Sequence, residues 1–215
     1  RNRIKELSVV AVFDLFENQS TYISRVKWTP YAFLGVAAFH HNPQAQAPAT
    51  DLNGNPLAEA GQWVDLRPLG TEGQHSDLDP NDVNFGIKPY SSLQMAIPFG
   101  LGARFRINEV MDLWADIGFR YTFTDYLDDV SQNYVDLDVL GSPLAQAMSY
   151  RTNEIPGYPT NPTPSALPGV NVQAGYGSEF PGNLRGSKAD RDIYMVTSFK
   201  LTYILGATFH RAKFR

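Results

Sequence analysis

The chain has 215 residues, of which 13% are aromatic, and a formal net charge of −4 at pH 7. This length suits one large all-β domain, and the charge provides no basic surface for nucleic acid. Because cysteine is absent, the chain forms neither a disulfide nor a thiolate metal site. It has no run of about 18 apolar residues and hence no transmembrane helix. The absence of such a run does not exclude a membrane β-barrel, because in barrel strands apolar residues alternate with polar ones.

Five segments have the pattern of long β-strands. They cover residues 6–17, 30–41, 93–107, 111–124 and 193–205. In four of them large apolar residues alternate with polar or small ones, which is the period of a strand with two different surroundings. The segment 30–41 is apolar on both sides, which is typical of a strand packed on small residues. All five are longer than the five or six residues that are about the norm in globular proteins.

The segment 111–124 alternates most regularly. One face carries Met111, Leu113, Ala115, Ile117, Phe119, Tyr121 and Phe123, and the other carries Asp112, Trp114, Asp116, Gly118, Arg120, Thr122 and Thr124. The polar face of the preceding segment is rich in Gly, Ala and Pro, which suits a crowded interior better than a water-facing surface. Pro98 in that segment has no backbone donor, so we expect a bulge or a local break in pairing there.

The connections between these segments differ greatly in length. Residues 18–27 and the few residues around Asn108 make short connections, whereas residues 41–91 and 126–190 make very long ones. The long connections are rich in Pro, Gly, Asn and Asp, which predicts irregular structure, with one helical stretch at 143–154. Tight turns at one end of a sheet and long loops at the other are typical of bacterial outer-membrane barrels, where the turns are periplasmic and the loops extracellular.

We therefore predict one domain over residues 1–215, an all-β antiparallel transmembrane β-barrel with eight strands. Single-chain bacterial barrels have an even number of strands, eight or more, so three strands are missing from the five recognised. The chain begins at Arg1 without a signal segment, so we expect the three strands and any export signal to lie upstream.

The alternative fold is a soluble calycin-like barrel, in which the apolar faces form a core and the polar faces meet water. The distribution of aromatic residues favours the membrane instead, because they gather near strand ends as in the girdles at the two membrane interfaces. The residues concerned are Trp28, Tyr31, Phe33, Tyr121, Phe123 and Tyr126.

In a membrane barrel the polar faces turn inward and have to neutralise their charges. The charged residues on these faces are Glu6, Asp14, Asp112 and Asp116, with Arg104, Arg106, Arg120 and Lys200. Four acids balance four bases, and a lysine or arginine turned to the bilayer midplane would cost about 2–4 kcal/mol. We predict that these residues form ion pairs that plug a narrow lumen.

No segment predicts a metal site or a cofactor. In HHNP (residues 40–43) the adjacent histidines point to opposite faces of a strand and are poor joint ligands. TDYLDDVS (124–131) and DLNGNP (51–56) lack the spacing and the closing glutamate of a calcium loop. We expect Asp125, Asp128 and Asp129 to be solvated loop acids.

The stretch LRPLGTEGQ (residues 66–74) predicts turns at Gly70 and Gly73, with Glu72 between them. It lacks the lysine and the Ser or Thr of a phosphate-binding loop. No serine, histidine and acid fall into the arrangement of a catalytic triad, so we predict no catalytic residue and no enzyme.

Four stretches together resemble one family, the PorG outer-membrane barrels of the type IX secretion system in Bacteroidota. They are TPYAFLGVAAFHHNP (29–43), residues 63–74 ending in PLGTEGQ, KPYSSLQMAIPFGLGARFRIN (88–108) and RYTFTDYLDDVSQNY (120–134). The resemblance runs from near Arg1 to the last strand and covers the C-terminal part of the family's length. The end FHRAKFR departs from the expected terminal aromatic residue, because Arg215 follows Phe214.

The resemblance implies a non-enzymatic role at the outer membrane. PorG-like proteins associate with the periplasmic ring formed by the lipoprotein PorK and its partner PorN, and so tie the ring to the membrane. This ring belongs to machinery that exports proteins and, in some species, supports gliding motility. The periplasmic turns are then the natural docking surface, so we expect Asn18, Gln19, Ser20, Asn108 and Glu109 to contact the ring.

The sequence is also compatible with two other functions. A small surface barrel would use its long outer loops to bind a ligand or to adhere. A membrane-embedded lipid-modifying enzyme would use His40 or His41 as a base, but it needs a nearby serine that the sequence does not provide.

Overall fold

The computed structural model describes residues 1–16, 26–154, 162–178, 180–187 and 189–205. The chain divides into two compact units. The sheet unit comprises Glu6–Phe39, Met95–Phe123 and Ile193–Arg215, and the loop unit comprises Arg1–Lys5, His40–Gln94 and Thr124–Asp192. Within the described ranges, no helix has the length and apolar character needed to cross a membrane.

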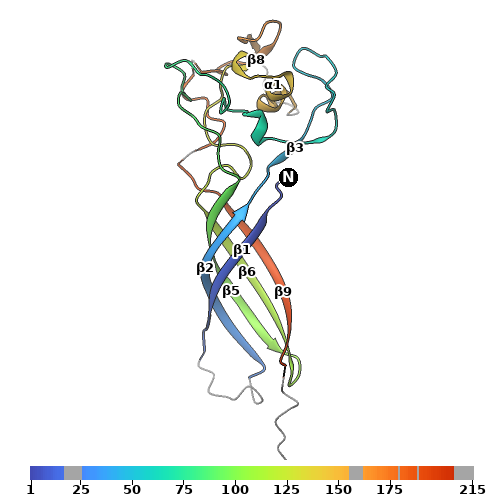
Figure 1. Ribbon diagram of the computed structural model, residues 1–215, viewed down its shortest axis with the longest axis vertical. Coiled ribbons are helices and arrows are strands. Elements are labelled where there is room, and N and C mark those ends of the chain that lie inside the picture. The colour runs from blue at the N-terminus through green and yellow to red at the C-terminus, as the bar shows by residue number, and fades with distance from the viewer. Residues whose placement is uncertain (17–25, 155–161, 179, 188, 206–215) are drawn as a thin grey trace, which may run out of the picture. The chain divides into compact units, whose positions relative to one another are not determined.

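Five long antiparallel strands form the sheet unit, and the strand prediction is confirmed (Figure 1). They are β1 (Lys5–Asp14), β2 (Trp28–His40), β5 (Leu93–Arg106), β6 (Met111–Thr122) and β9 (Ile193–Tyr203). The strands are hydrogen-bonded in the order β1-β2-β5-β6-β9, so β1 and β9 are the edges of the described sheet. The register sets Ile117 opposite Leu101 on one side and Thr197 on the other, which keeps odd-numbered residues of the three strands on one face.

The two faces of the sheet differ in side-chain exposure. On one face Leu7, Leu101 and Phe199 are 78%, 62% and 73% exposed. On the other face Asp112 and Asp116 are only 4% and 6% exposed. This is the reverse of a water-soluble sheet, where large apolar residues are covered and carboxylates meet the solvent.

Strand β2 places Tyr31 and Phe33 on the polar face. Tyr31 and Phe33 are buried, and a Cβ added at Gly100 or Gly118 would lie 2.7 or 2.6 Å from the Phe33 ring. A Cβ at Gly102 would meet the Tyr31 ring in the same way. The prediction that segment 30–41 packs on small residues is confirmed. The assignment of Tyr31 and Phe33 to a membrane-interface girdle is wrong, because both rings occupy space that these glycines leave free.

Pairing between β5 and β6 continues without interruption past Pro98, so the expected bulge is absent on this side. The backbone N–H of Phe123 donates to the carbonyl oxygen of Met95 at 3.1 Å. Since hydrogen-bonding direction alternates along an antiparallel strand, the nitrogen of Pro98 faces away from β6, where its missing donor costs this pairing nothing.

Replacing Gly100 by valine should destabilise the sheet unit, because the added methyl groups would occupy the space of the Phe33 ring. Overpacking of this kind costs about 1–3 kcal/mol. Gly141→Val is the control, since nothing lies within 4 Å of a Cβ at Gly141. On a gel run without boiling, the folded protein migrates as a separate band from the unfolded chain. The temperature at which this folded band disappears should fall for Gly100→Val only. Equal temperatures for the two variants would contradict the packing described.

Short elements make up the loop unit. They are β3 (Gln44–Gln46) paired with β4 (Trp63–Asp65), β7 (Pro162–Pro164) paired with β8 (Asn171–Gln173), the 3-10 helices η1 (Arg67–Leu69), η2 (Leu137–Val139) and η3 (Thr152–Glu154), and helix α1 (Pro143–Ser149). The helical stretch predicted at 143–154 is thus present as α1 and η3. Helix α1 begins after Ser142, whose hydroxyl accepts a hydrogen bond from the Ala145 N–H at 3.1 Å.

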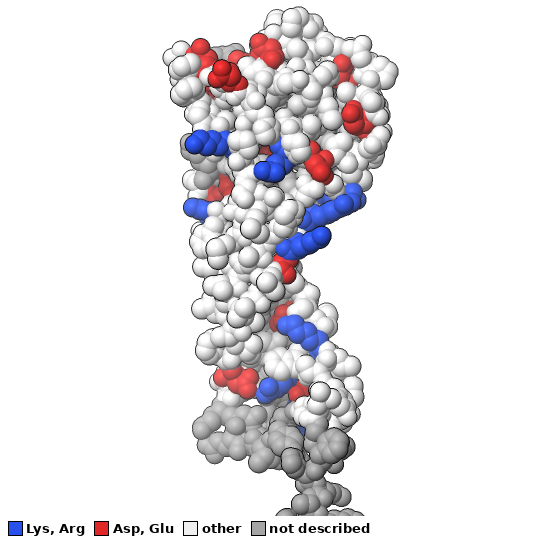
Figure 2. Space-filling view, viewed as in Figure 1, with Lys and Arg blue, Asp and Glu red and all other residues white. Residues whose placement is uncertain are grey.

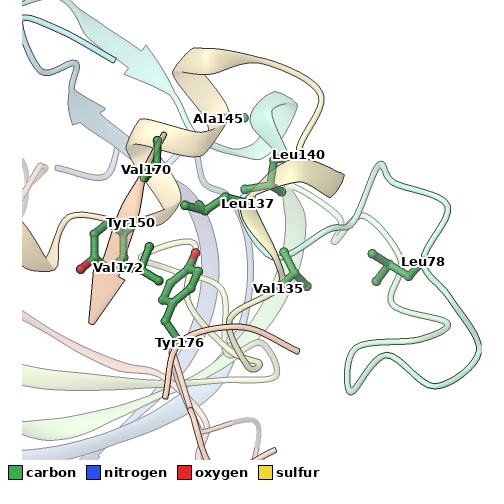
Figure 3. Packing of buried hydrophobic residues seen from close by; sticks show 9 residues of the cluster. All are labelled: Leu78, Val135, Leu137, Leu140, Ala145, Tyr150, Val170, Val172 and Tyr176. Atoms are coloured by element: carbon green, nitrogen blue, oxygen red, sulfur yellow. The ribbon is translucent and has the colours of Figure 1, made fainter. Parts of the chain in front are cut away.

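A hydrophobic core of its own holds the loop unit together (Figure 3). Its buried members are Leu78, Val135, Leu137, Leu140, Ala145, Tyr150, Val170, Val172 and Tyr176. The Tyr176 ring lies 4.9 Å from the rings of both Tyr134 and Tyr150, measured between centroids. The two long connections, expected to be irregular, therefore pack together around a core that the local sequence pattern does not reveal.

Candidate functional site

The polar face of the sheet brings six of the eight predicted lumen residues together as three ion pairs. Arg120 lies 3.2 Å from Glu6, Arg104 lies 3.2 Å from Asp14, and Lys200 lies 2.9 Å from Asp116. Each pair joins two different strands of the sheet. On the face drawn in Figure 2, charged side chains are sparse over the strands and the surface is largely uncharged.

The remaining two residues of the set, Arg106 and Asp112, stand directly opposite each other in the register of β5 and β6. Asp112 is buried, and Arg106 Nε donates to the carbonyl oxygen of Asn108 at 3.4 Å. The eight charged residues therefore gather on the face opposite the exposed apolar one.

Hydroxyl groups complete two of the ion pairs. The Tyr194 hydroxyl donates to Glu6 at 2.7 Å. The hydroxyls of Tyr31 and Ser198 donate to the two carboxylate oxygens of Asp116 at 3.0 and 2.6 Å. Both carboxylates thus receive a cation and at least one neutral donor, which is what charge removed from water requires.

A cavity of about 460 Å³ adjoins this network within the sheet unit. Its lining combines the apolar side chains of Val10, Phe33 and Val196 with the charged groups of Asp116 and Lys200. The polar face is thus incompletely filled by the five described strands.

The predicted docking residues belong to the two short connections. Asn18, Gln19 and Ser20 lie outside the described residues. Asn108 and Glu109 form the turn between β5 and β6, where Asn108 Oδ1 accepts the N–H groups of residues 110 and 111, both at 2.9 Å. Asn108 therefore holds the turn in shape, and both Asn108 and Glu109 are exposed.

The adjacent histidines have different surroundings. His40 is exposed, whereas His41 is buried and stacks on the Tyr90 ring at a centroid distance of 5.7 Å. Burial lowers the pKa of His41 below its usual range, so its imidazole is neutral at pH 7. Across the described ranges, no group of three or more His, Asp or Glu side chains is placed to hold a metal ion.

A buried polar cluster in the loop unit is the feature that the sequence analysis missed. Glu72 and Asp129 are both fully buried. The Arg185 side chain, 8% exposed, lies 3.2 Å from Glu72 Oε1 and 3.9 Å from Asp129 Oδ2. The expectation of a solvated acid is therefore wrong for Asp129, whereas Asp128 is exposed and Asp125 is partly buried.

Hydrogen bonds join the segments that carry Glu72 and Asp129 to each other and to Tyr90. The backbone N–H groups of residues 131 and 132 donate to Glu72 Oε1 at 2.8 and 3.1 Å. The hydroxyls of Thr71 and Tyr90 donate to Asp129, both at 2.6 Å. Since Glu72 and Arg185 are 113 positions apart, no local spacing signals their contact.

The segment that carries Arg185 lies directly on the backbone of residues 130–131. A Cβ at Gly186 would lie 2.7 Å from the Ser131 nitrogen, so only glycine permits this approach. Asp129 itself adopts a positive φ of 71°, an unusual conformation that a short polar side chain tolerates. PLGTEGQ and TDYLDDVS, two of the motifs behind the family resemblance, thus meet in one buried site.

Burial has the largest effect on the pKa values of Glu72 and Asp129, and it raises both although Arg185 opposes it. Burial, followed by the charge of Asp129, also raises the pKa of Tyr90. Burial and the charge of Glu72 raise the pKa of Tyr126 to about 12. Both tyrosines are therefore neutral at physiological pH, and the Tyr90 hydroxyl can donate to Asp129.

Comparison of the chain with family models, with curated proteins and with solved structures finds no match. What the residues define is a mainly β protein whose sheet has an exposed apolar face and an ion-paired polar face. Its function is inferred from these features together with the family resemblance described above.

Proposed function

We propose that this chain is part of an eight-stranded outer-membrane β-barrel that anchors a periplasmic ring of the PorK and PorN type. Its role is structural, in a machinery for type IX protein secretion and gliding. The observation that carries the proposal is the sheet with large apolar side chains exposed on one face and paired charges on the other.

Hydrocarbon is the solvent that suits such a sheet. All five strands contribute exposed apolar side chains, among them Leu7, Leu34, Leu101, Ile117 and Phe199. A soluble monomer rarely leaves a contiguous apolar patch above a few hundred Å² in water. Lipid can cover such a patch without a free-energy cost. The charged side chains, which would be destabilising in contact with lipid, lie on the opposite face.

A ring of eight strands also accounts for the contact between the two edge strands. Glu6 belongs to β1 and Tyr194 to β9, the first and fifth strands in the order of the sheet. In a ring of eight, these two strands face each other across the lumen. Such a lumen is only wide enough for side chains to fill it, so a tyrosine and a glutamate from opposite walls meet at its centre. The 2.7 Å bond between Tyr194 and Glu6 supports this arrangement.

Closing this ring requires three strands beyond those described. Their inward side chains would fill the cavity of about 460 Å³ beside Val10 and Val196. Their backbones would pair the free edges of β1 and β9, which lipid does not tolerate unpaired.

The turn between β5 and β6 lies at the end of the sheet where β5 ends and β6 begins, and the proposal assigns this end to the periplasm. Glu109 is exposed there. Reversing this charge changes the surface of the turn, whereas a change at Asn108 would remove the hydrogen bonds that hold the turn.

Charge reversal at this turn tests the anchoring role. Glu109→Lys should reduce the ring proteins recovered with the chain after mild detergent extraction several-fold, because a favourable contact becomes repulsive. Asp138→Lys, the same change at an exposed acid of the loop unit, is the control. Both variants should keep the heat-modifiable gel migration of a folded barrel. Undiminished recovery of the ring with Glu109→Lys would count against docking at this turn.

A further inference from the structure

The buried cluster of the loop unit contains two acids and one base. Arg185 is the only cation within 4.0 Å of Glu72 or Asp129 among the described residues. If both carboxyls were ionised, one negative charge would lie in surplus away from water. An unbalanced buried charge of this kind is costly, and proteins relieve it by taking up a proton or a counter-ion.

Hydrogen bonding distinguishes the two acids. Asp129 receives the Tyr90 hydroxyl on Oδ1 and the Thr71 hydroxyl on Oδ2, so both of its oxygens are stabilised as a carboxylate. The side-chain and backbone donors to Glu72 converge on Oε1. Its other oxygen, Oε2, is buried and accepts no hydrogen bond from the described residues. Oε2 of Glu72 is therefore the atom at which a surplus negative charge is least stabilised.

A proton fits this atom better than a metal ion does. Glu72 lines neither of two loop-unit cavities of about 470 and 550 Å³, although Arg185 lines the second of them. Within the described ranges, no three acidic or histidine side chains converge as a metal site would require. A proton needs neither a cavity nor a coordination sphere.

The groups around this cluster act in opposite directions on the pKa of its acids, and burial has the largest effect. The titratable and charged residues that influence this cluster are Arg67, Tyr90, Tyr126, Asp128, Asp129 and Arg185. Arg185 favours the charged form of Glu72, but burial outweighs it and raises the pKa. A carboxyl whose pKa is higher in the folded than in the unfolded state binds a proton on folding. The stability that this proton contributes is fully present below the unfolded pKa and is lost as the pH rises through the folded pKa.

We propose that the loop unit takes up one proton at Glu72 as it closes, so that acidic conditions tighten the unit and alkaline conditions loosen it. This device does not depend on the membrane location. If the long connections are extracellular, as proposed above, the pH of the surrounding medium controls how tightly the unit is closed.

A buried thiol can report the opening of the loop unit, because the chain has no cysteine of its own. Ala145→Cys places a thiol in the hydrophobic core, where Ala145 is 1% exposed. The rate of maleimide labelling in the folded protein, divided by the rate in the unfolded protein at the same pH, measures the opening equilibrium. With Glu72 intact, opening should increase as the pH rises above about 4.3, the usual pKa of a glutamate, and should level off once the pH has passed the raised pKa of the folded state.

Two variants of the Ala145→Cys protein test whether Glu72 is the group that takes up the proton. Glu72→Gln imitates the protonated side chain and should open less than the parent at alkaline pH, with the pH dependence lost. Asp138→Asn, which neutralises an exposed acid of the same unit, should keep the parent's pH dependence. Opening that stays constant or decreases as the pH rises, or an unchanged slope in Glu72→Gln, would overturn the proposal.

If Glu72→Gln does not fold, the unaltered chain still gives an answer. With glutamate labelled by ¹³C at the carboxyl, one resonance should titrate above the usual value of about 4.3. A chain in which all glutamates titrate at or below that value would also overturn the proposal.

Discussion

Replacing Ile117 by lysine should prevent assembly of the sheet in a membrane. Ile117 lies in the middle of β6, 52% exposed, between Leu101 and Thr197 in the register. A lysine at the bilayer midplane costs about 2–4 kcal/mol, which is a large part of the stability of a typical domain. The measurement is the fraction of chains that reach the heat-modifiable folded form when refolded into lipid vesicles over a range of urea concentrations.

Phe85→Lys is the matched control for this prediction. Phe85 is 58% exposed, slightly more than Ile117, but it belongs to the loop unit. The same change from a large apolar residue to lysine should leave folding into vesicles unaffected there. A soluble protein would tolerate lysine at either exposed position, so equal behaviour of the two variants would exclude lipid on the apolar face.

Removing one partner of the pair between Arg120 and Glu6 should have the second large effect. Their side chains are 12% and 16% exposed, so Arg120→Met leaves Glu6 as an uncompensated charge on the polar face. Loss of one partner of a buried pair costs about 3–5 kcal/mol. The free energy of unfolding from urea titration in detergent micelles should fall accordingly.

Two further variants separate charge balance from loss of packing. Glu6→Gln combined with Arg120→Met removes both charges and should recover much of the stability, while the introduced amide oxygen can still accept the Tyr194 hydroxyl. Arg104→Met should cost less than Arg120→Met, because Arg104 and Asp14 are 20% and 34% exposed. A double variant as unstable as Arg120→Met alone would show that ion pairing is not what stabilises this face.

The strands of the sheet could be predicted because alternation is a local property. Segments 93–107 and 111–124 carry a period-two pattern strong enough to assign each residue to a face. Strand β2 carries no such signal, since its residues are apolar on both sides. The inward direction of Tyr31 and Phe33 follows from glycines on β5 and β6 that lie about 70 to 85 positions later, and only the register brings them together.

The site in the loop unit could not be predicted for a related reason. The local sequence does predict turns at residues 70–73 and a group of acidic side chains at residues 124–131. Whether an acid such as Asp129 is solvated or buried depends on Arg185, a distant residue with no motif of its own. Long-range contacts therefore decide the character of the cluster, and a single sequence does not show them.

Spin labels on single cysteines along β6 offer the most direct test of the proposed membrane location, since the chain is free of native cysteine. Labels would be placed at residues 113, 114, 116, 117 and 119 of the protein reconstituted in lipid, and their collision rates with oxygen and with a water-soluble nickel complex compared. We expect oxygen to dominate at Leu113, Ile117 and Phe119, and to fall at Trp114 and Asp116. The claim fails if the nickel complex reaches the first three positions freely, because those side chains would then face water where we have placed the lipid tails.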